Sequence, residues 1–149
     1  MNKNINIEET FSLALENHKN KNFQSAKDLY KKILEISPNS AGVYYNLGIL
    51  YKEIEKYQKA QDCYEKAIQI NPKYSNVYYN YGNILLELRE MKKAKDCYEK
   101  LLSLDQTYKK GYSGYGNLLL KIGQHVKGLS YIRKGDGVIR FSQKDVKII

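Results

Sequence analysis

Few residues of the chain have the types and spacing that catalysis or metal binding requires. The two histidines, His18 and His125, are far apart, and neither belongs to a Cys/His cluster or an HExxH pattern, although metal ligands usually occur at short, characteristic spacings. Gly111, Gly114 and Gly116 fall inside a predicted helix, whereas phosphate-binding glycine loops connect a strand to a helix. We therefore expect no metal, no cofactor and no catalysis.

The two cysteines, Cys63 and Cys97, occur 34 positions apart. Equivalent atoms of neighbouring packed helices lie about 8–10 Å apart, which exceeds the roughly 7 Å limit for a disulfide. We interpret both cysteines as small buried residues of a protein in a reducing compartment.

The formal net charge of +9 favours acidic partners at moderate salt. Lysines recur at a fixed step, and an aspartate precedes each of the first three by four residues, so we expect i,i+4 ion pairs on solvated helix faces. These residues are Lys32, Lys66, Lys100 and Lys134, with Asp28, Asp62 and Asp96. Because arginine occurs only at 89, 133 and 140, specific recognition of nucleic acid is not expected.

A repeated segment organises these residues. The run Tyr44-Tyr45-Asn46-Leu47-Gly48 returns after 34 residues as Tyr78-Tyr79-Asn80-Tyr81-Gly82, and after another 34 in weaker form from Tyr112 to Gly116. The same step links Ala26, Ala60 and Ala94, then Tyr30, Tyr64 and Tyr98, and finally Pro38 and Pro72. A fixed period of this length indicates a stack of similar supersecondary units.

Each unit has the pattern of two helices. Tyr44, Leu47 and Tyr51 define one face with a period near 3.6, and Gly48 provides space beside them. A second face follows at Ala60, Tyr64, Ala67 and Ile68, and Asn71-Pro72 ends it, because proline disfavours continuation of a helix.

The unit resembles a tetratricopeptide repeat. Eight positions of the family pattern match, namely Tyr44, Leu47, Gly48, Tyr51, Ala60, Tyr64, Ala67 and Pro72. The resemblance implies an all-α fold, a right-handed superhelical solenoid of about four helix-turn-helix repeats. We expect the array over residues 1–142, with units at about 7–40, 41–74, 75–108 and 109–142, and a short non-helical C-terminal tail at 143–149.

Several units depart from the pattern. The missing proline after Asp105-Gln106 predicts that the second helix of unit three runs on or frays differently. Gly128 and Gly135 in unit four each cost about 1 kcal/mol relative to alanine inside a helix, so we expect unit four to be the least stable. The apolar residues 138–141 and the tail show no polar capping helix. Either the tail covers the last helix pair, or a twin chain or a downstream domain does.

The resemblance also predicts a concave groove lined by positions two, five, six, nine, twelve and thirteen of the first helices. It assigns to this groove Tyr45, Asn46, Lys52, Tyr79, Asn80, Asn83, Asn117 and Lys121, flanked by Tyr74 and Tyr108. Asparagine amides bind a peptide main chain irrespective of its sequence, and tyrosines add rigid apolar area with a polar tip.

Two known groove types can be compared. Asn46 and Asn80 resemble two rungs of the asparagine ladder in the repeat region of O-linked N-acetylglucosamine transferases, although the abundance of asparagine in this chain explains them equally well. The carboxylate clamp of chaperone-binding repeat domains fits poorly, because only Asn46 matches its five positions.

We therefore predict a cytoplasmic protein-interaction scaffold or adaptor, without catalysis, that binds an extended and acidic polypeptide in the groove. The alternative is the N-terminal, substrate-recruiting repeat region of a larger enzyme of glycosyltransferase or oxygenase type. A third possibility is non-specific binding of RNA or a membrane surface, with strong salt dependence. No apolar run approaches the roughly 20 residues of a membrane span, and a homodimer through the C-terminal unit is possible.

Overall fold

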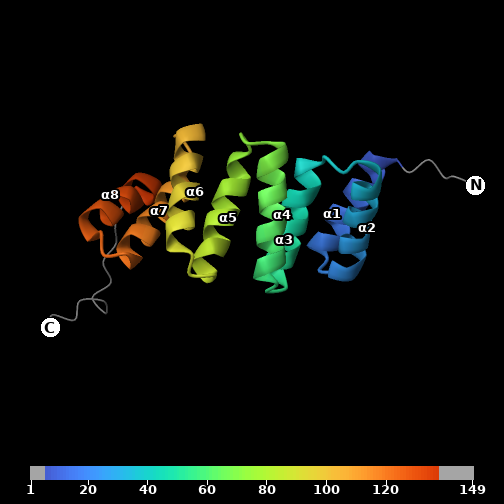
Figure 1. The fold of residues 1–149 in the computed structure, drawn as a ribbon, viewed down its shortest axis with the longest axis horizontal. Helices are drawn as coiled ribbons and strands as arrows, with labels where there is room; N and C mark the ends of the chain where they lie inside the picture. The colour runs from blue at the N-terminus through green and yellow to red at the C-terminus, as the bar shows by residue number, and fades with distance from the viewer. Residues whose placement is uncertain (1–5, 138–149) are drawn as a thin grey trace, which may run out of the picture.

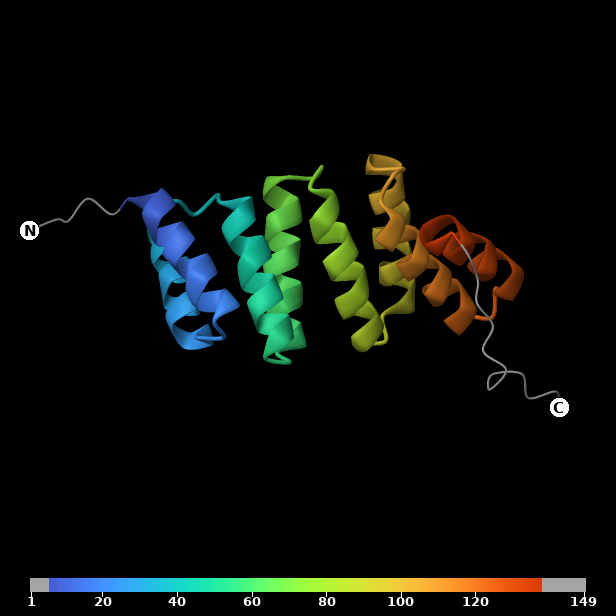
Figure 2. The same cartoon turned by 180° about the vertical axis from the view of Figure 1, so that it is seen from behind.

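A computed structural model of the chain describes residues 6–137, and within this range it contains eight α-helices. The helices are α1 (Ile7–Lys19), α2 (Phe23–Ile36), α3 (Ala41–Glu53), α4 (Tyr57–Ile70), α5 (Ser75–Glu87), α6 (Met91–Leu104), α7 (Lys109–Lys121) and α8 (His125–Asp136). Figures 1 and 2 show an elongated stack of helix pairs in chain order, with α1 and α8 at opposite ends. The chain is thus an all-α solenoid. The apolar run 138–141 and the expected tail at 143–149 lie outside the described residues.

Among the described helices, none combines the length and apolar character needed to cross a lipid bilayer.

Local sequence signals account for the helix ends. The Asn6 side chain caps α1 by accepting hydrogen bonds from the backbone N–H groups of Glu8 and Glu9, which otherwise have no partner. Contrary to the expectation from the missing proline, the second helix of unit three neither runs on nor ends differently, because α6 ends at Leu104, the position equivalent to Ile70 of α4. Gln106 stands where Pro72 occurs, and the residue before it supplies the stop signal: the Asp105 carboxylate accepts hydrogen bonds from the backbone N–H and the hydroxyl of Thr107, as the Asn71 side chain accepts one from the Lys73 N–H.

The turn inside each unit uses a left-handed backbone conformation at the same position. Lys21, Glu55 and Arg89 have φ angles of 61°, 59° and 61°, and Gly123 in unit four has a φ of 81°. Only glycine adopts this region without a steric cost. The first three units therefore hold a non-glycine residue where the backbone favours glycine.

Buried side chains form two clusters. The N-terminal core joins α1, α2 and α3 to one residue of α4, and consists of Ala14, Ala26, Tyr30, Ile33, Val43, Leu47, Leu50 and Cys63. The C-terminal core runs from α4 to α7 and includes Tyr64, Tyr78, Tyr81, Ile84, Leu85, Tyr98, Leu101, Tyr115, Leu118 and Leu119. Across units, α3 contacts α5 and α5 contacts α7, so the first helices of successive units share one face.

The glycines of unit four lie at close contacts between α7 and α8. A Cβ atom on Gly128 would lie 2.8 Å from the carbonyl oxygen of Gly116, and one on Gly135 would lie 2.7 Å from the carbonyl oxygen of Lys109. Real Cβ atoms do not approach backbone atoms this closely. These glycines lower the helix propensity of α8, but they permit a close approach of α7 and α8 that alanine would prevent.

The expected ladder of ion pairs does not form. The described residues make two lysine–carboxylate pairs, Lys93–Glu90 and Lys95–Glu99, and Nε2 of His18 lies 3.4 Å from Oε2 of Glu53. The pairs predicted from Asp28, Asp62 and Asp96 are not among them. Exposed ion pairs gain little free energy in water, and Asp28 instead accepts hydrogen bonds from Nε2 of Gln24 at 2.8 and 2.9 Å.

Candidate functional site

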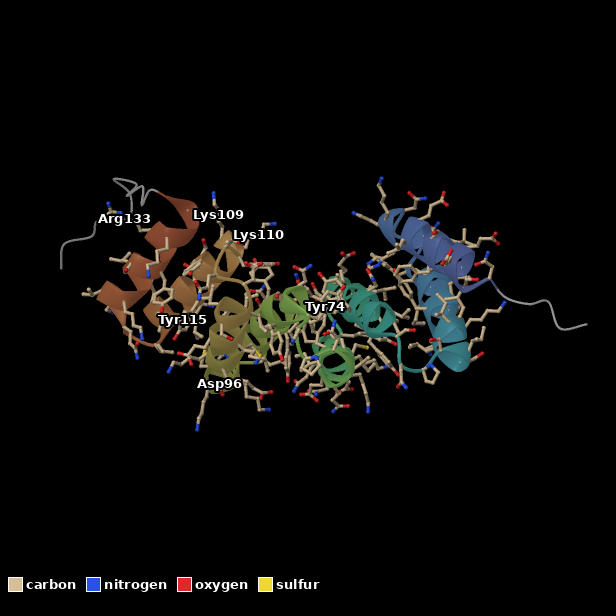
Figure 3. The ribbon with its side chains drawn as sticks, turned by 90° about the horizontal axis from the view of Figure 1, so that it is seen from above. Tyr74, Asp96, Lys109, Lys110, Tyr115 and Arg133 are labelled. Carbon is tan, nitrogen blue, oxygen red and sulfur yellow. The ribbon has the colours of Figure 1, made fainter. Side chains whose placement is uncertain are left out.

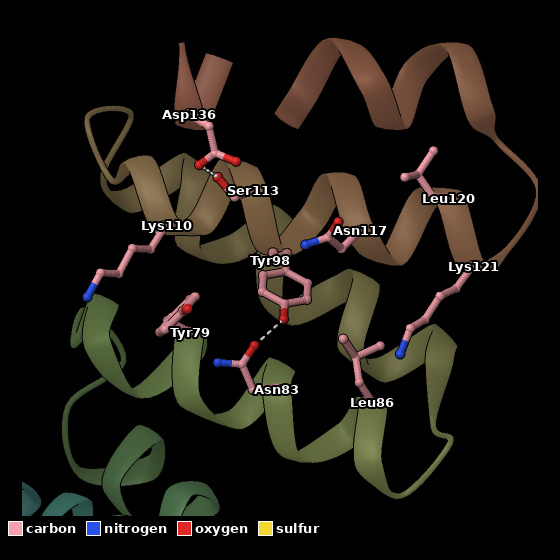
Figure 4. A pocket seen from close by; sticks show the side chains of 11 residues that line it. Tyr79, Asn83, Leu86, Tyr98, Lys110, Ser113, Asn117, Leu120, Lys121 and Asp136 are labelled. Atoms are coloured by element: carbon pink, nitrogen blue, oxygen red, sulfur yellow. Dashed lines mark hydrogen bonds between the residues drawn. The ribbon is translucent and has the colours of Figure 1, made fainter. Parts of the chain in front are cut away.

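A pocket of about 540 Å³ opens between α5 and α7 (Figure 4). Every lining residue from these two helices occupies one of the six positions that the repeat pattern assigns to the groove. They are Tyr79, Asn83 and Leu86 from α5, and Lys110, Ser113, Gly114, Asn117, Leu120 and Lys121 from α7. Tyr98 of α6 and Asp136 of α8 complete the lining. The pocket therefore brings together four of the predicted site residues, Tyr79, Asn83, Asn117 and Lys121.

Tyr98 forms the floor of the pocket and orients the Asn83 side chain on one wall. Its hydroxyl donates a hydrogen bond of 2.6 Å to Oδ1 of Asn83, and Figure 4 shows the amide nitrogen of Asn83 turned away from this bond. Tyr98 is 0% exposed, and its ring lies directly beneath the pocket because two glycines leave room for it: a Cβ on Gly82 would be 3.1 Å from the ring, and one on Gly114 would be 2.8 Å away.

The tyrosines predicted to flank the groove pack against those predicted to line it. The ring centroids of Tyr45 and Tyr74 are 5.1 Å apart, and those of Tyr79 and Tyr108 are 5.5 Å apart. All four side chains are half-buried. Each pair joins the first helix of a unit to the residue that precedes the next one, which gives the groove a wall of aromatic rings.

The two asparagines of the proposed ladder already hold internal hydrogen bonds. Nδ2 of Asn80 donates to the Tyr45 hydroxyl at 3.0 Å and to the Asn76 carbonyl at 3.2 Å. Nδ2 of Asn46 donates to the Gly42 carbonyl at 2.8 Å. Asn80 therefore has both amide N–H donors committed within the chain and Asn46 has one of its two, while the carbonyl oxygens of both side chains accept none of the hydrogen bonds found in the described part.

Lys52 is half-buried in α3 and does not line this pocket. The same repeat position is occupied by Leu86 and Leu120 one and two units further on, where both leucines contact the pocket. Applying the 34-residue repeat to position 52 once and then twice would have identified both leucines. Lys110 and Ser113 occupy groove positions two and five, so the same rule would have found these two residues.

The hydroxyls of Tyr45, Tyr74 and Tyr108 have a raised pKa and are neutral at physiological pH. Burial raises the pKa of Tyr45, nearby Tyr74 and Tyr108 raise it further, and the hydrogen bond from Asn80 lowers it. Burial also raises the pKa of Tyr74 and Tyr108. These three hydroxyls therefore offer neutral donors and acceptors, while the positive charge of the pocket comes from Lys110 and Lys121.

The cysteines lie away from this pocket. Both are buried and free, and burial raises the pKa of Cys63 and of Cys97 to about 12. Since the thiolate is the reactive form of cysteine, neither thiol is activated. Among the described residues there is also no group of three or more side chains that fits a metal ion.

The fold and its groove define a class of protein, an all-α solenoid of stacked helix pairs. Models of the tetratricopeptide repeat match residues 11–40, 41–74 and 63–96. These matches together extend over residues 11–96, more than half of the chain, and the chain belongs to the tetratricopeptide-repeat family.

Solved structures agree with this assignment. A crystal structure of MamA is 26% identical, with a TM-score of 0.82 over 89% of this chain and 77% of that chain. Another MamA structure is 27% identical, with a TM-score of 0.79 over 87% of this chain and 71% of that chain. A structure of PilF from Pseudomonas aeruginosa is 23% identical, with a TM-score of 0.82 over 91% and 62% of the two chains, and bears on the fold alone. A comparison with curated protein sequences gave no match. The family and these neighbours support a general role as a protein-interaction scaffold.

Proposed function

We propose that this protein is a scaffold or adaptor that binds an extended polypeptide segment in the pocket between α5 and α7. The observation that carries the proposal is the convergence of Tyr79, Asn83, Asn117 and Lys121 on one open pocket. The volume of about 540 Å³ lies within the range of about 300–1,000 Å³ typical of ligand sites.

The polar groups of the pocket suit a peptide main chain. Asn83 has its carbonyl oxygen bonded to Tyr98, so its two N–H donors serve a peptide carbonyl. Asn117 is exposed on α7 and supplies both a donor and an acceptor. Two asparagines from successive units thus bind the main chain from opposite walls, and Tyr79 packs against the peptide side chains.

The proposed partner has acidic character. The two cations of the pocket, Lys110 and Lys121, are both exposed, and complementary charge accelerates association and selects among partners. The resemblance to the asparagine ladder adds a weaker contribution from Asn46 and Asn80, which would act through their carbonyl oxygens. The alternative role as the recruiting region of a larger enzyme stays a prediction.

The test is peptide capture by a triple variant, Y79A/N83A/N117A, on an array of extended acidic peptides followed by titration of the strongest binder. We expect the affinity to fall at least tenfold, because each lost contact removes about 1 kcal/mol. Gln106→Ala is the control, since Gln106 carries an exposed amide in the turn between α6 and α7, outside the six groove positions and outside the pocket lining. Circular dichroism checks that helicity is retained, and unchanged binding by a folded triple variant would refute the groove.

A further inference from the structure

The positive charge of the chain is concentrated in its last helix pair. From Lys109 to Gly137 the single acidic residue Asp136 accompanies six basic residues, which are Lys109, Lys110, Lys121, Lys127, Arg133 and Lys134. Residues 75–108 are balanced, with Arg89, Lys92, Lys93, Lys95 and Lys100 against Glu87, Glu90, Asp96, Glu99 and Asp105. Figure 3 shows Lys109, Lys110 and Arg133 along one side of the C-terminal helices.

Two of these lysines line the pocket, one at each end of α7. Lys110 and Lys121 are eleven residues apart, which is about three helical turns and about 16 Å along the axis, so both lie on the same face. Figure 4 shows their side chains at opposite ends of the pocket, with Tyr79, Asn83 and Asn117 between them. The charge therefore sits at the two ends and the centre of the pocket is uncharged.

We propose that the pocket selects a peptide segment with two acidic side chains four or six residues apart, one paired with Lys110 and the other with Lys121. This inference rests on the proposed function. Alternate side chains of an extended strand point to opposite sides, so two side chains face α7 together only at an even spacing. At about 3.3 Å per residue, four residues extend over ~13 Å and six over ~20 Å, which bracket the ~16 Å that separates the two lysines along α7 and lie within the reach of flexible lysine side chains. The main chain between the acidic residues meets the amides of Asn83 and Asn117.

The two ends of the pocket are not equivalent. At the Lys110 end, Oδ1 of Asp136 accepts a hydrogen bond of 2.6 Å from the Ser113 hydroxyl, and this carboxylate repels an incoming anion. At the Lys121 end the pocket is lined by Leu86 and Leu120, with no acidic residue. The Lys121 end therefore binds its acidic side chain more strongly, and an apolar side chain beside it gains contact with the two leucines.

The same lysines would attract the phosphates of a single-stranded nucleic acid. Proteins that bind single strands combine positive charge that follows the nucleic-acid backbone with aromatic rings that stack on the bases. This pocket has the aromatic ring of Tyr79, but its two cations are separated by asparagines and leucines. The observations favour the acidic peptide, and binding of RNA is an outcome of the test.

The experiment uses the full chain and fluorescein-labelled synthetic peptides of serine, threonine and leucine that carry two glutamates. The glutamates are placed at i and i+2, at i and i+4, at i and i+5, at i and i+6, or at i and i+9, with a poly(U) RNA as an additional probe. Fluorescence anisotropy should give the tightest binding for the i,i+4 or the i,i+6 peptide and weaker binding for the i,i+5 peptide, whose two glutamates point to opposite sides of the strand. Lys110→Gln or Lys121→Gln should each weaken binding of the tightest peptide about three- to fivefold. Asp136→Asn should strengthen peptide binding about twofold. Of the two lysine variants, K121Q should lose more affinity than K110Q.

Lys109→Gln is the matched control, because Lys109 is an exposed neighbour of Lys110 that does not line the pocket. Peptides that all bind equally, or a K109Q loss equal to the K110Q loss, would overturn the spacing proposal while leaving peptide binding intact. Binding of none of the peptides would overturn the proposed function as well. Tighter binding of poly(U) than of any peptide would assign the site to nucleic acid instead.

Discussion

The N-terminal and C-terminal cores are built from the same repeat but stabilised differently. At the α4–α5 and α6–α7 junctions a tyrosine of one unit donates to a glutamate of the unit before it: Tyr81 to Glu65 and Tyr115 to Glu99, both at 2.5 Å. At the α2–α3 junction the corresponding residues are Lys31 and Leu47, which cannot form this hydrogen bond.

The N-terminal core has a different polar contact. His18 is buried, with Nδ1 located 3.4 Å from the Tyr30 hydroxyl and Nε2 located 3.4 Å from Glu53 of the next unit. In the C-terminal core, Tyr98 instead bonds to Asn83 on the pocket wall. The comparison indicates that the C-terminal core supports the pocket, whereas the N-terminal core contributes to the length and stability of the stack.

Truncation of a buried leucine in each core should separate these two roles. Leu118→Ala and Leu50→Ala remove side chains that are 0% and 1% exposed, so each should lower the free energy of unfolding by about 2–5 kcal/mol. Amide hydrogen exchange should rise mainly in α5–α7 for L118A and mainly in α1–α3 for L50A, because stability in a repeat array is largely local. Only L118A should also weaken peptide binding, and equal exchange throughout the stack in both variants would show a single cooperative core.

Alanine at a helical glycine should have opposite effects in the two regions. Gly128→Ala should destabilise by about 1–3 kcal/mol, because its Cβ would press on the Gly116 carbonyl in the α7–α8 contact. Gly42→Ala in α3 meets no atom within 4 Å and should stabilise by up to about 1 kcal/mol. Urea denaturation measures both changes, and a stabilising G128A would show that α7 and α8 can separate without cost.

The equivalent tyrosines Tyr64 and Tyr98 provide a comparison inside the C-terminal core. Tyr98→Phe removes the hydrogen bond to Asn83 and should cost about 1 kcal/mol as well as some peptide affinity. The Tyr64 hydroxyl is buried without a hydrogen-bond partner in the described part of the chain, so Tyr64→Phe should be neutral or stabilising. Urea midpoints decide between these outcomes, and a loss for Y64F equal to that for Y98F would indicate a bound water at Tyr64.

Acid should weaken the α4–α5 junction through Glu65. Hydrogen bonds from Tyr81 and Gln61 lower the pKa of Glu65 below its usual 4.5, so the interaction stabilises the fold above this value and is lost as the pH falls through the lowered pKa. Tyr81→Phe should therefore cost stability at neutral pH and cost less in acid.

Unfolding in urea at about pH 7 and about pH 3 tests this change in the α4–α5 junction. Tyr78→Phe is the control, because the Tyr78 hydroxyl donates to the Pro72 carbonyl, which does not titrate. A Y81F effect that is the same at both pH values would contradict the role of Glu65.

Most of the fold follows from the sequence because the repeat is nearly regular. The 34-residue step and the asparagine cap at Asn6 are local signals, and the helices follow them. The helix ends that depend on side-chain chemistry were harder to predict, as Asp105 shows. The glycines of unit four were interpreted from helix propensity alone, since their role is visible only when α7 and α8 are placed together.

The candidate site was predictable by position but not by chemistry. The six groove positions include every pocket residue of α5 and α7. Asp136 was not predictable, because its place beside Ser113 depends on how α8 crosses α7. Tyr98 is a core residue, as its sequence pattern indicates, and its place directly beneath the pocket depends on Gly114, which stands where Asn46 and Asn80 occur in the two preceding units.

The turns at Lys21, Glu55 and Arg89 offer a means of engineering heat tolerance. Unit four already has glycine at the equivalent position, so the same replacement in the other three units copies a solution that the chain itself contains. Relief of the left-handed conformation would raise the melting temperature from sites that line neither the groove nor a core. A scaffold stabilised in this way would tolerate the more disruptive substitutions needed to redesign the groove for other peptides.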